Sequence, residues 1–121
     1  MLIATAITIT VGLVVIRVRT SHGIVDTKTD KARYEVQMLS DVVEDYRKEY
    51  GRYPSNEEGL LELVRVGQIR KVPTDPWSHA YQYRFPGWHS PKSFDLWSYG
   101  ADGQPGGSGV DKDIGNWDMD A

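Results

Sequence analysis

The sequence predicts an α+β fold in which a long helix and a shorter second helix are followed by a small antiparallel sheet. Apolar side chains recur at helical spacing through residues 27–50, and a capping signal opens a second apolar stretch at Ser55. Two runs of alternating large and polar side chains then lie on either side of a Pro-Gly turn. The chain has 121 residues, which suits one domain built around one core.

Residues 1–16 form an uncharged and mostly apolar segment. As a helix it would be about 24 Å long, less than the roughly 30 Å of a bilayer core. Three interpretations are open: a short anchor, the apolar region of a signal peptide, or a membrane helix that begins upstream of Met1. The segment lacks the basic start and small-residue cleavage site of a signal peptide, so we favour the membrane helix. Arg17 and Arg19 would favour a cytoplasmic C-terminal flank, which leaves the orientation open.

The middle of the chain predicts one long amphipathic helix. Between residues 27 and 50, apolar side chains are spaced by three or four positions, which places them on one stripe. Gly51 supplies a left-handed terminator, and Pro54 follows it. We expect the stripe to pack on the protein's own domain, with direct contact to partner helices as the alternative. The stripe consists of Ala32, Val36, Leu39, Val43, Tyr46 and Tyr50.

A second, shorter helix is predicted next. Ser55 and Glu58 have the Ser-x-x-Glu spacing of a capping box, in which each side chain accepts the backbone N–H of the other residue. Gly67 is expected to end this helix. Its apolar residues are Leu60, Leu61, Leu63 and Val64.

Two antiparallel strands are predicted after the second helix. Residues 80–85 and 93–99 each alternate large and polar side chains, as a half-buried strand does. Pro86 and Gly87 mark a turn between them.

The C-terminal part is acidic and rich in glycine. Residues 74–121 carry 3 basic and 7 acidic side chains, and all seven acids are Asp. Asp102, Asp111 and Asp113 suit a hard cation, because Ca²⁺ binds carboxylate and carbonyl oxygens and a glycine-rich loop can turn its carbonyls inward. The spacing is not that of an EF-hand, so a solvated acidic loop without a metal is the other interpretation.

Composition excludes several classes of protein. Lysine and arginine number 14 against 17 acidic residues, a net charge of −3, which is not the basic excess of a nucleic-acid-binding protein. The chain has no cysteine, which excludes disulfides, thiolate catalysis and cysteine-ligated zinc or iron–sulfur clusters.

Residues for catalysis are few. A carbohydrate hydrolase would need a carboxylate pair, with tryptophans as sugar platforms. The tryptophans, however, lie in strand-like or turn positions where packing is an ordinary use. The histidines lie in separate segments without the arrangement of a catalytic triad. We therefore expect no enzyme and no small-molecule substrate. The residues concerned are Trp77, Trp88, Trp97, Trp117, His22, His79 and His89.

Several uncommon motifs follow one another between residues 30 and 117. They are GRYPSNEEGL at 51–60, VPTDPW at 72–77, AYQY at 80–83, SYGADGQPGG at 98–107 and DIGNW at 113–117. With them the chain resembles the major pseudopilins of the bacterial type II secretion system, the G components of the general secretion pathway.

This resemblance implies a pilin-like fold. A long N-terminal helix, membrane anchor plus stalk, would pack on a small domain with a second helix and a short antiparallel sheet closed by a calcium-binding loop. Residues 1–25 would be the anchor part of the helix, and residues 26–121 the globular domain. The cofactor implied is Ca²⁺, held by the side chains of Asp102, Asp111 and Asp113 and by the carbonyls of Tyr99 and Val110. The family's variable spacing leaves the register of Asp111 against Lys112 open.

The resemblance also implies a structural role. The subunit would be a single-pass protein of the bacterial inner membrane with its globular domain in the periplasm. It would polymerise into a helical filament, the pseudopilus, which drives export of folded proteins across the outer membrane. The partners implied are further copies, minor pseudopilins, the inner-membrane secretion assembly platform, and membrane lipid before assembly. No nucleic acid is implied.

Two neighbouring families are the alternatives. Type IV pilins commonly close their C-terminal domain with a disulfide, which a chain without cysteine cannot form. Minor pseudopilins commonly carry larger inserted domains than 121 residues allow.

The start of the sequence departs from the family's pattern. The family has a basic leader and a processing site of the type Gly-Phe-Thr-Leu-x-Glu before the apolar helix, and the residues after that glutamate are similar to Met1, Leu2 and Ile3. We expect an incomplete N-terminus. About five further mature residues would bring the apolar span to roughly 21, enough to cross a bilayer.

Overall fold

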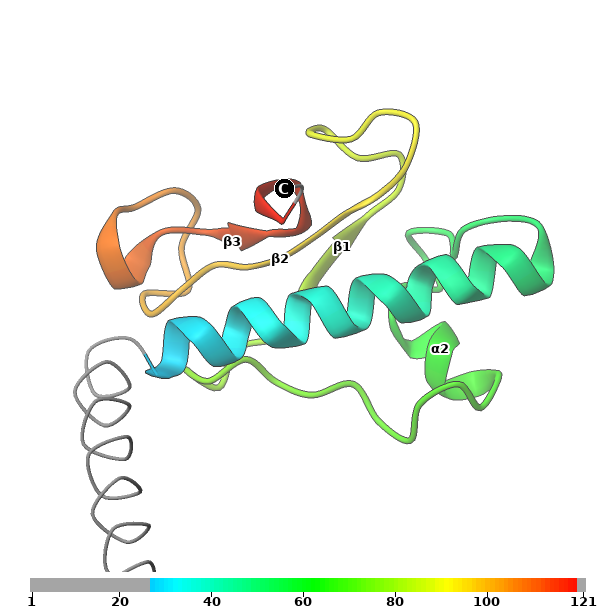
Figure 1. Cartoon of the computed structure of the whole chain (residues 1–121), viewed down its shortest axis with the longest axis horizontal. Helices are drawn as coiled ribbons and strands as arrows, with labels where there is room; N and C mark the ends of the chain where they lie inside the picture. Colours follow the sequence, from blue (N-terminus) through cyan, green and yellow to red (C-terminus); the bar gives the residue numbers. More distant parts are fainter. Residues whose placement is uncertain (1–26, 120–121) are drawn as a thin grey trace, which may run out of the picture.

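The computed structural model describes residues 27–119. The first element in this part of the chain is a long helix over residues 27–50. The three-stranded sheet lies along one side of the helix, and the short helix α2 (Leu61–Arg65) lies near its C-terminal end (Figure 1). The predicted combination of a long helix and a small antiparallel sheet is confirmed. The predicted anchor, residues 1–25, lies outside the described residues. Among residues 27–119, no helix has both the length and the apolar character needed to cross a membrane.

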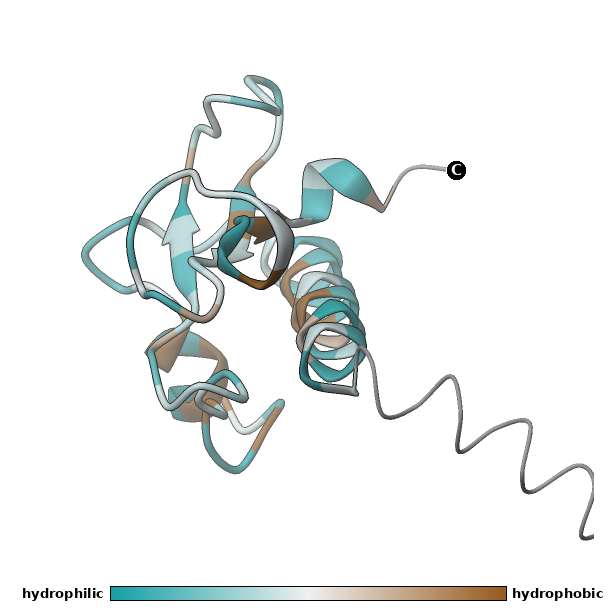
Figure 2. Cartoon of the chain, turned by 90° about the vertical axis from the view of Figure 1, so that its left-hand side faces the viewer, coloured by the Kyte–Doolittle hydropathy of each residue, from teal (hydrophilic) through white to brown (hydrophobic). Residues whose placement is uncertain are grey.

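The apolar stripe of the long helix forms the centre of the core. Five of its six predicted members are buried, and they pack with Leu63, Phe94 and Leu96. Figure 2 shows the helix end-on beside the sheet, with hydropathy in colour. The prediction is wrong for the sixth member, Tyr50, which is 45% exposed, because the stripe extends one turn beyond the core. The Tyr50 ring instead contacts the ring of Tyr46, with centroids 4.6 Å apart.

The predicted turn signals end both helices. Gly51 has a φ of +75°, and its N–H donates to the carbonyl of Arg47 at 2.8 Å, which closes the long helix. Gly67 has a φ of +80° after α2, where its N–H and that of Gln68 donate to the carbonyls of Val64 and Leu63, both at 3.0 Å. This pair of bonds is a Schellman motif, which satisfies carbonyls that the helix leaves unpaired.

The capping box forms, but α2 is shorter than predicted. The backbone N–H of Ser55 donates to the Glu58 carboxylate at 2.8 Å, and the N–H of Glu58 donates to the Ser55 hydroxyl at 3.1 Å. These bonds close a turn over residues 56–60, and the helix itself begins only at Leu61. Gly59 lies in this turn with a φ of +59°, which interrupts regular helix before Leu61.

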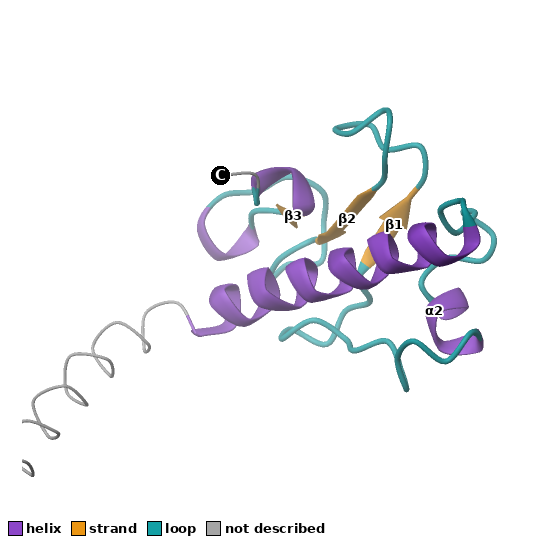
Figure 3. Cartoon of the chain, turned by 45° about the vertical axis from the view of Figure 1, so that its right-hand side comes forward, coloured by secondary structure: helices purple, strands orange, loops and turns teal. Residues whose placement is uncertain are grey.

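The sheet has the order β1-β2-β3, with both neighbouring pairs antiparallel. Strands β1 (Gln82–Arg84) and β2 (Asp95–Ser98) confirm the predicted pair, although each is shorter than its alternating run. Strand β3 (Ile114–Gly115) pairs with Trp97 and Ser98 of β2. The 3₁₀ turns η1 (Gly109–Asp111) and η2 (Asn116–Asp118) flank β3 (Figure 3).

Candidate functional site

The loop from residue 99 to residue 113 leaves β2 and returns to β3, and its two ends are pressed together. Gly100 has a φ of +80°, and a Cβ there would lie 2.8 Å from the backbone oxygens of Asp111 and Lys112. The N–H of Ala101 donates to the carbonyl of Val110 at 2.8 Å, which ties the ends further. Position 100 therefore requires glycine for both conformation and space.

A buried carboxylate anchors the start of this loop. Asp75 is 3% exposed, and its Oδ1 accepts the backbone N–H groups of Trp77 and His79. Its Oδ2 accepts the hydroxyl of Ser98 at 2.7 Å, and the Ser98 oxygen in turn accepts the N–H of Gly100 at 3.0 Å. The turn after Asp75 and the calcium loop predicted from the sequence are therefore linked through one side chain.

Of the five predicted ligands, Asp113 has the surroundings that best suit a bound cation. Its Oδ2 accepts the N–H of Gly106 at 3.1 Å, which holds the tip of the loop. Its Oδ1 is buried and has no hydrogen-bond partner among residues 27–119. A buried carboxylate oxygen without a donor is costly, so a cation at this oxygen would be stabilising.

The other four predicted ligands are more exposed or already engaged. Asp102 is exposed, and its Oδ1 accepts the N–H of Gln104 at 3.0 Å. Asp111 is half-buried, and Val110, 54% exposed, already accepts one hydrogen bond at its carbonyl. Tyr99 is half-buried with its ring edge-on to Trp97. Within residues 27–119, no group of three His, Cys, Asp or Glu side chains lies close enough to hold a metal ion. The ligand set therefore stays a prediction.

A second feature, here called the polar hollow, lies on the long helix. It has a volume of about 190 Å³ and is lined by Gln37, Ser40, Asp41 and Glu44 of the helix, with Ser90 and Asn116 opposite. Ser40 is only 7% exposed, and neither its hydroxyl nor Oε1 of Glu44 has a hydrogen-bond partner among the described residues. The polar hollow thus contains buried acceptor oxygens and two carboxylates, which suits a cationic group.

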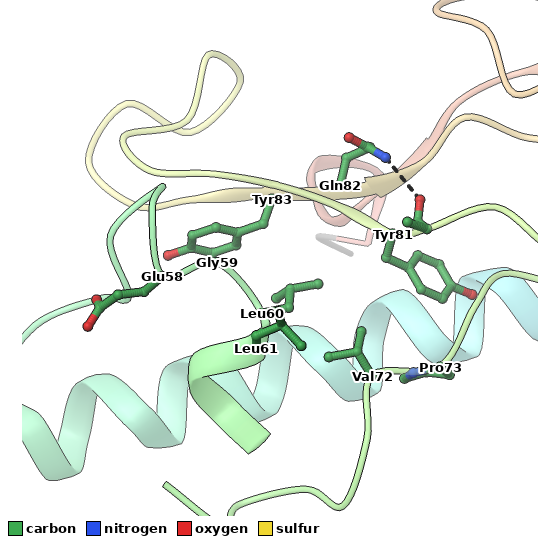
Figure 4. A pocket seen from close by; sticks show the side chains of 10 residues that line it. Glu58, Gly59, Leu60, Leu61, Val72, Pro73, Tyr81, Gln82 and Tyr83 are labelled. Carbon is green, nitrogen blue, oxygen red and sulfur yellow. Dashed lines mark hydrogen bonds between the residues drawn. The ribbon is translucent and has the colours of Figure 1, made fainter. Parts of the chain in front are cut away.

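A third hollow of about 360 Å³ separates β1 from α2 and the segment at Val72 and Pro73. Figure 4 shows its walls, in which Leu60, Leu61 and the ring of Tyr83 face one another. Its one carboxylate, Glu58, is held by the Arg52 guanidinium through bonds of 2.8 and 3.1 Å. The pKa of Glu58 is lowered to about 2. The hydrogen bond from Arg52 is the largest cause, and the hydrogen bond from the N–H of Ser55 is the next. This carboxylate has a structural role.

Sequence reasoning missed the two buried aspartates that organise the loops. Asp95 is 1% exposed and accepts the backbone N–H groups of Trp88, His89 and Ser90, which shapes the loop between β1 and β2. Asp75 does the same for the turn at residues 76–79. For Asp75 a signal was present, since an Asp that bonds the N–H two residues on is a common turn former. For Asp95 there was none, because its partners lie five to seven positions earlier.

Comparison with known proteins identifies the family of the chain. The family model described as "Type II secretion system (T2SS), protein G" matches residues 20–117. The type II secretion system core protein G of Pseudomonas aeruginosa is 38% identical over 104 residues, which cover 75% of this chain and 72% of that protein. The core protein G of Vibrio cholerae is 35% identical over 101 residues, covering 74% and 68%.

A solved structure supports the same assignment. The crystal structure of the major pseudopilin from the type 2 secretion system of enterohaemorrhagic Escherichia coli superposes with a TM-score of 0.69 at 31% identity. The match covers 83% of this chain and 91% of that one. Its family is structural and not enzymatic, as the sequence led us to expect. The chain therefore belongs to the type II secretion system protein G family, the major pseudopilins.

Proposed function

We propose that this major pseudopilin is held in the bacterial inner membrane by residues 1–25 as a single-pass anchor, with residues 26–121 in the periplasm. Copies then polymerise into a helical filament that drives export of folded proteins across the outer membrane, together with minor pseudopilins and the inner-membrane assembly platform. The observation that carries the proposal is the family match over residues 20–117, which includes the long helix and the loop. The uncharged segment at residues 1–16 supports the anchor.

The polar hollow supports contact between copies. The Ser40 hydroxyl and Oε1 of Glu44 have no hydrogen-bond partner among residues 27–119, and a buried polar group left unpaired costs about 1–3 kcal/mol. Arg70 and Lys71 are both exposed, and neither forms an ion pair within residues 27–119. We propose that one of these cations enters the polar hollow of a neighbouring copy. A cation there would give Oε1 of Glu44 the partner that it lacks within residues 27–119.

Disulfide cross-linking tests this contact, because the chain has no cysteine of its own. The double variant Ser40→Cys with Lys71→Cys is expressed with the secretion apparatus and oxidised in membranes. We expect a ladder of covalent multimers. The matched control joins Lys71→Cys with Glu49→Cys, an exposed residue outside the polar hollow, and should give no ladder. Equal ladders from both variants, or none from the first, would refute the contact.

We also propose that the loop binds Ca²⁺ through the side chains of Asp102, Asp111 and Asp113 and the carbonyls of Tyr99 and Val110. The orphaned buried oxygen of Asp113 supports this, since oxygen ligands are what Ca²⁺ prefers. The carbonyl of Val110 accepts one hydrogen bond, and its second lone pair could bind the ion. When bound, the ion would neutralise carboxylates and hold the two ends of the loop against β2 and β3.

A further inference from the structure

The sheet has an aromatic cleft on the face opposite the long helix. Along β2, Leu96 joins the core with the helix, so the side chain of Trp97 points to the other face. There a cavity of about 310 Å³ lies between the loop after β1 and the loop after β2. Figure 1 shows these two loops on the side of the sheet away from the long helix. The aromatic rings that line this aromatic cleft are those of Trp88, His89, Trp97, Tyr99 and Trp117, and Pro105 and the carboxylates of Asp95 and Asp113 complete the lining.

Close contacts hold several rings of the aromatic cleft in place. The Arg84 guanidinium lies 4.1 Å from the ring centroid of Trp88. The His89 ring stacks on Trp117 with centroids 3.7 Å apart, and His89 Nδ1 lies 3.1 Å from the carboxylate of Asp95. A Cβ at Gly115 would overlap the Trp117 ring, so the indole packs directly against the backbone there. These rings are preorganised for binding.

Exposure and unpaired polar groups distinguish the aromatic cleft from core packing. Trp88 is 72% exposed, with the Arg84 guanidinium over its ring. Within residues 27–119, neither the Tyr99 hydroxyl nor the indole N–H groups of Trp88, Trp97 and Trp117 make a hydrogen bond. A purely apolar ligand would bury these groups without partners, at a cost. A ligand with many hydroxyls would satisfy them.

We propose that the aromatic cleft binds a short, neutral oligosaccharide. The negative faces of aromatic rings attract the weakly positive C–H faces of pyranose rings, while the indole N–H groups and the Tyr99 hydroxyl bond sugar oxygens. The 7 acidic against 3 basic side chains of residues 74–121 disfavour anionic ligands. The volume of about 310 Å³ is at the small end of ligand pockets and limits the ligand to a short saccharide.

Calorimetric titration of the full chain tests the proposal. The protein is kept in lauryldimethylamine oxide, a detergent without a sugar headgroup, and titrated with the β-1,4-linked trimer of N-acetylglucosamine and with cellotriose. We expect saturable binding of at least one sugar with a dissociation constant of about 1 mM or lower. Trp88→Ala should weaken it by about tenfold or more. Trp88 is exposed, so this variant is expected to fold, which far-ultraviolet circular dichroism checks.

Two further variants complete the test. Trp97→Ala should weaken binding in the same way as Trp88→Ala. Tyr34→Ala removes a 70% exposed aromatic ring from the long helix and should leave binding unchanged. The proposal is overturned if neither sugar binds up to about 10 mM, tenfold above the weakest expected constant. It is also overturned if both tryptophan variants bind as the unaltered chain does, or if a neutral proline-rich peptide binds and the sugars do not.

Discussion

The hydroxyl of Ser98 donates a 2.7 Å hydrogen bond to the buried carboxylate of Asp75, which lies 23 positions earlier in the chain. Ser98 is fully buried at the end of β2, and its oxygen also accepts the N–H of Gly100. The bond joins the proline-flanked turn to the beginning of the predicted calcium loop. It therefore couples two segments that share no secondary structure.

We expect Ser98→Ala to destabilise the domain by about 1–3 kcal/mol, because it leaves a buried carboxylate oxygen and a backbone N–H without partners. The midpoint of urea unfolding measures this. The control is Ser108→Ala, an exposed serine in the same loop, which should change stability by less than about 0.5 kcal/mol. Equal effects of the two variants would show that the Ser98 bond has no special role.

Gly100→Ala should disrupt the loop. Both Gly100 and Gly106 have a φ of +80°, so alanine at either position has the same backbone strain, roughly 1–2 kcal/mol. Only at Gly100 would the new Cβ meet backbone atoms, at 2.8 Å, whereas position 106 has open space. Thermal unfolding should therefore show a larger loss for Gly100→Ala than for Gly106→Ala. Matching losses would contradict the close approach of the loop's two ends.

Lowering the pH should remove the contribution of the Glu58 carboxylate to the stability of the domain. Its pKa is lowered to about 2, chiefly by the Arg52 guanidinium, from 4.5 for the free group. A carboxyl with a lowered pKa in the folded state contributes stability that is complete above its unfolded value and lost as pH falls towards about 2. Urea midpoints measured between about pH 6 and about pH 2 should fall less steeply in Glu58→Gln than in the unaltered chain. Glu57→Gln, an exposed neighbour, should keep the original slope.

Removing calcium should lower the melting temperature. A ligand that binds only the folded state stabilises it by about 2.7 kcal/mol at one hundred times its dissociation constant, and each kcal/mol corresponds to roughly 4–8 °C for a domain of this size. A chelator should therefore lower the midpoint of the unaltered chain by several degrees and leave Asp113→Ala unchanged. Asp45→Ala, on the exposed side of the helix, should respond as the unaltered chain does. A chelator without effect would refute the calcium site.

The long helix was predictable because its stripe is a local pattern, and the core contains it from Ala32 to Tyr46. The end of the core near Tyr50 was not predictable, since it depends on how far the sheet and α2 extend. Strand β3 has only two residues, too few for alternation to appear, and it forms because β2 offers a free edge.

The candidate site was predictable only in part. Glycine and aspartate content indicated a loop that could bind a cation. It did not indicate that, of the three aspartates predicted as ligands, Asp113 is the one with a buried oxygen that lacks a partner among residues 27–119. The anchoring role of Asp75 depends on Ser98, which is distant in sequence. The aromatic cleft combines tryptophans from β2, η2 and the loop after β1, and no spacing rule relates such segments.

Electron microscopy of the full chain, expressed with its secretion apparatus, tests most directly whether copies polymerise through the polar hollow. We expect helical filaments from the unaltered chain, no filaments from Glu44→Arg, and filaments again when Glu44→Arg is combined with Arg70→Glu and Lys71→Glu. Glu49→Arg, which reverses an exposed charge outside the polar hollow, should form filaments normally. Dispersed subunits from the unaltered chain, or normal filaments from Glu44→Arg, would contradict polymerisation through the polar hollow.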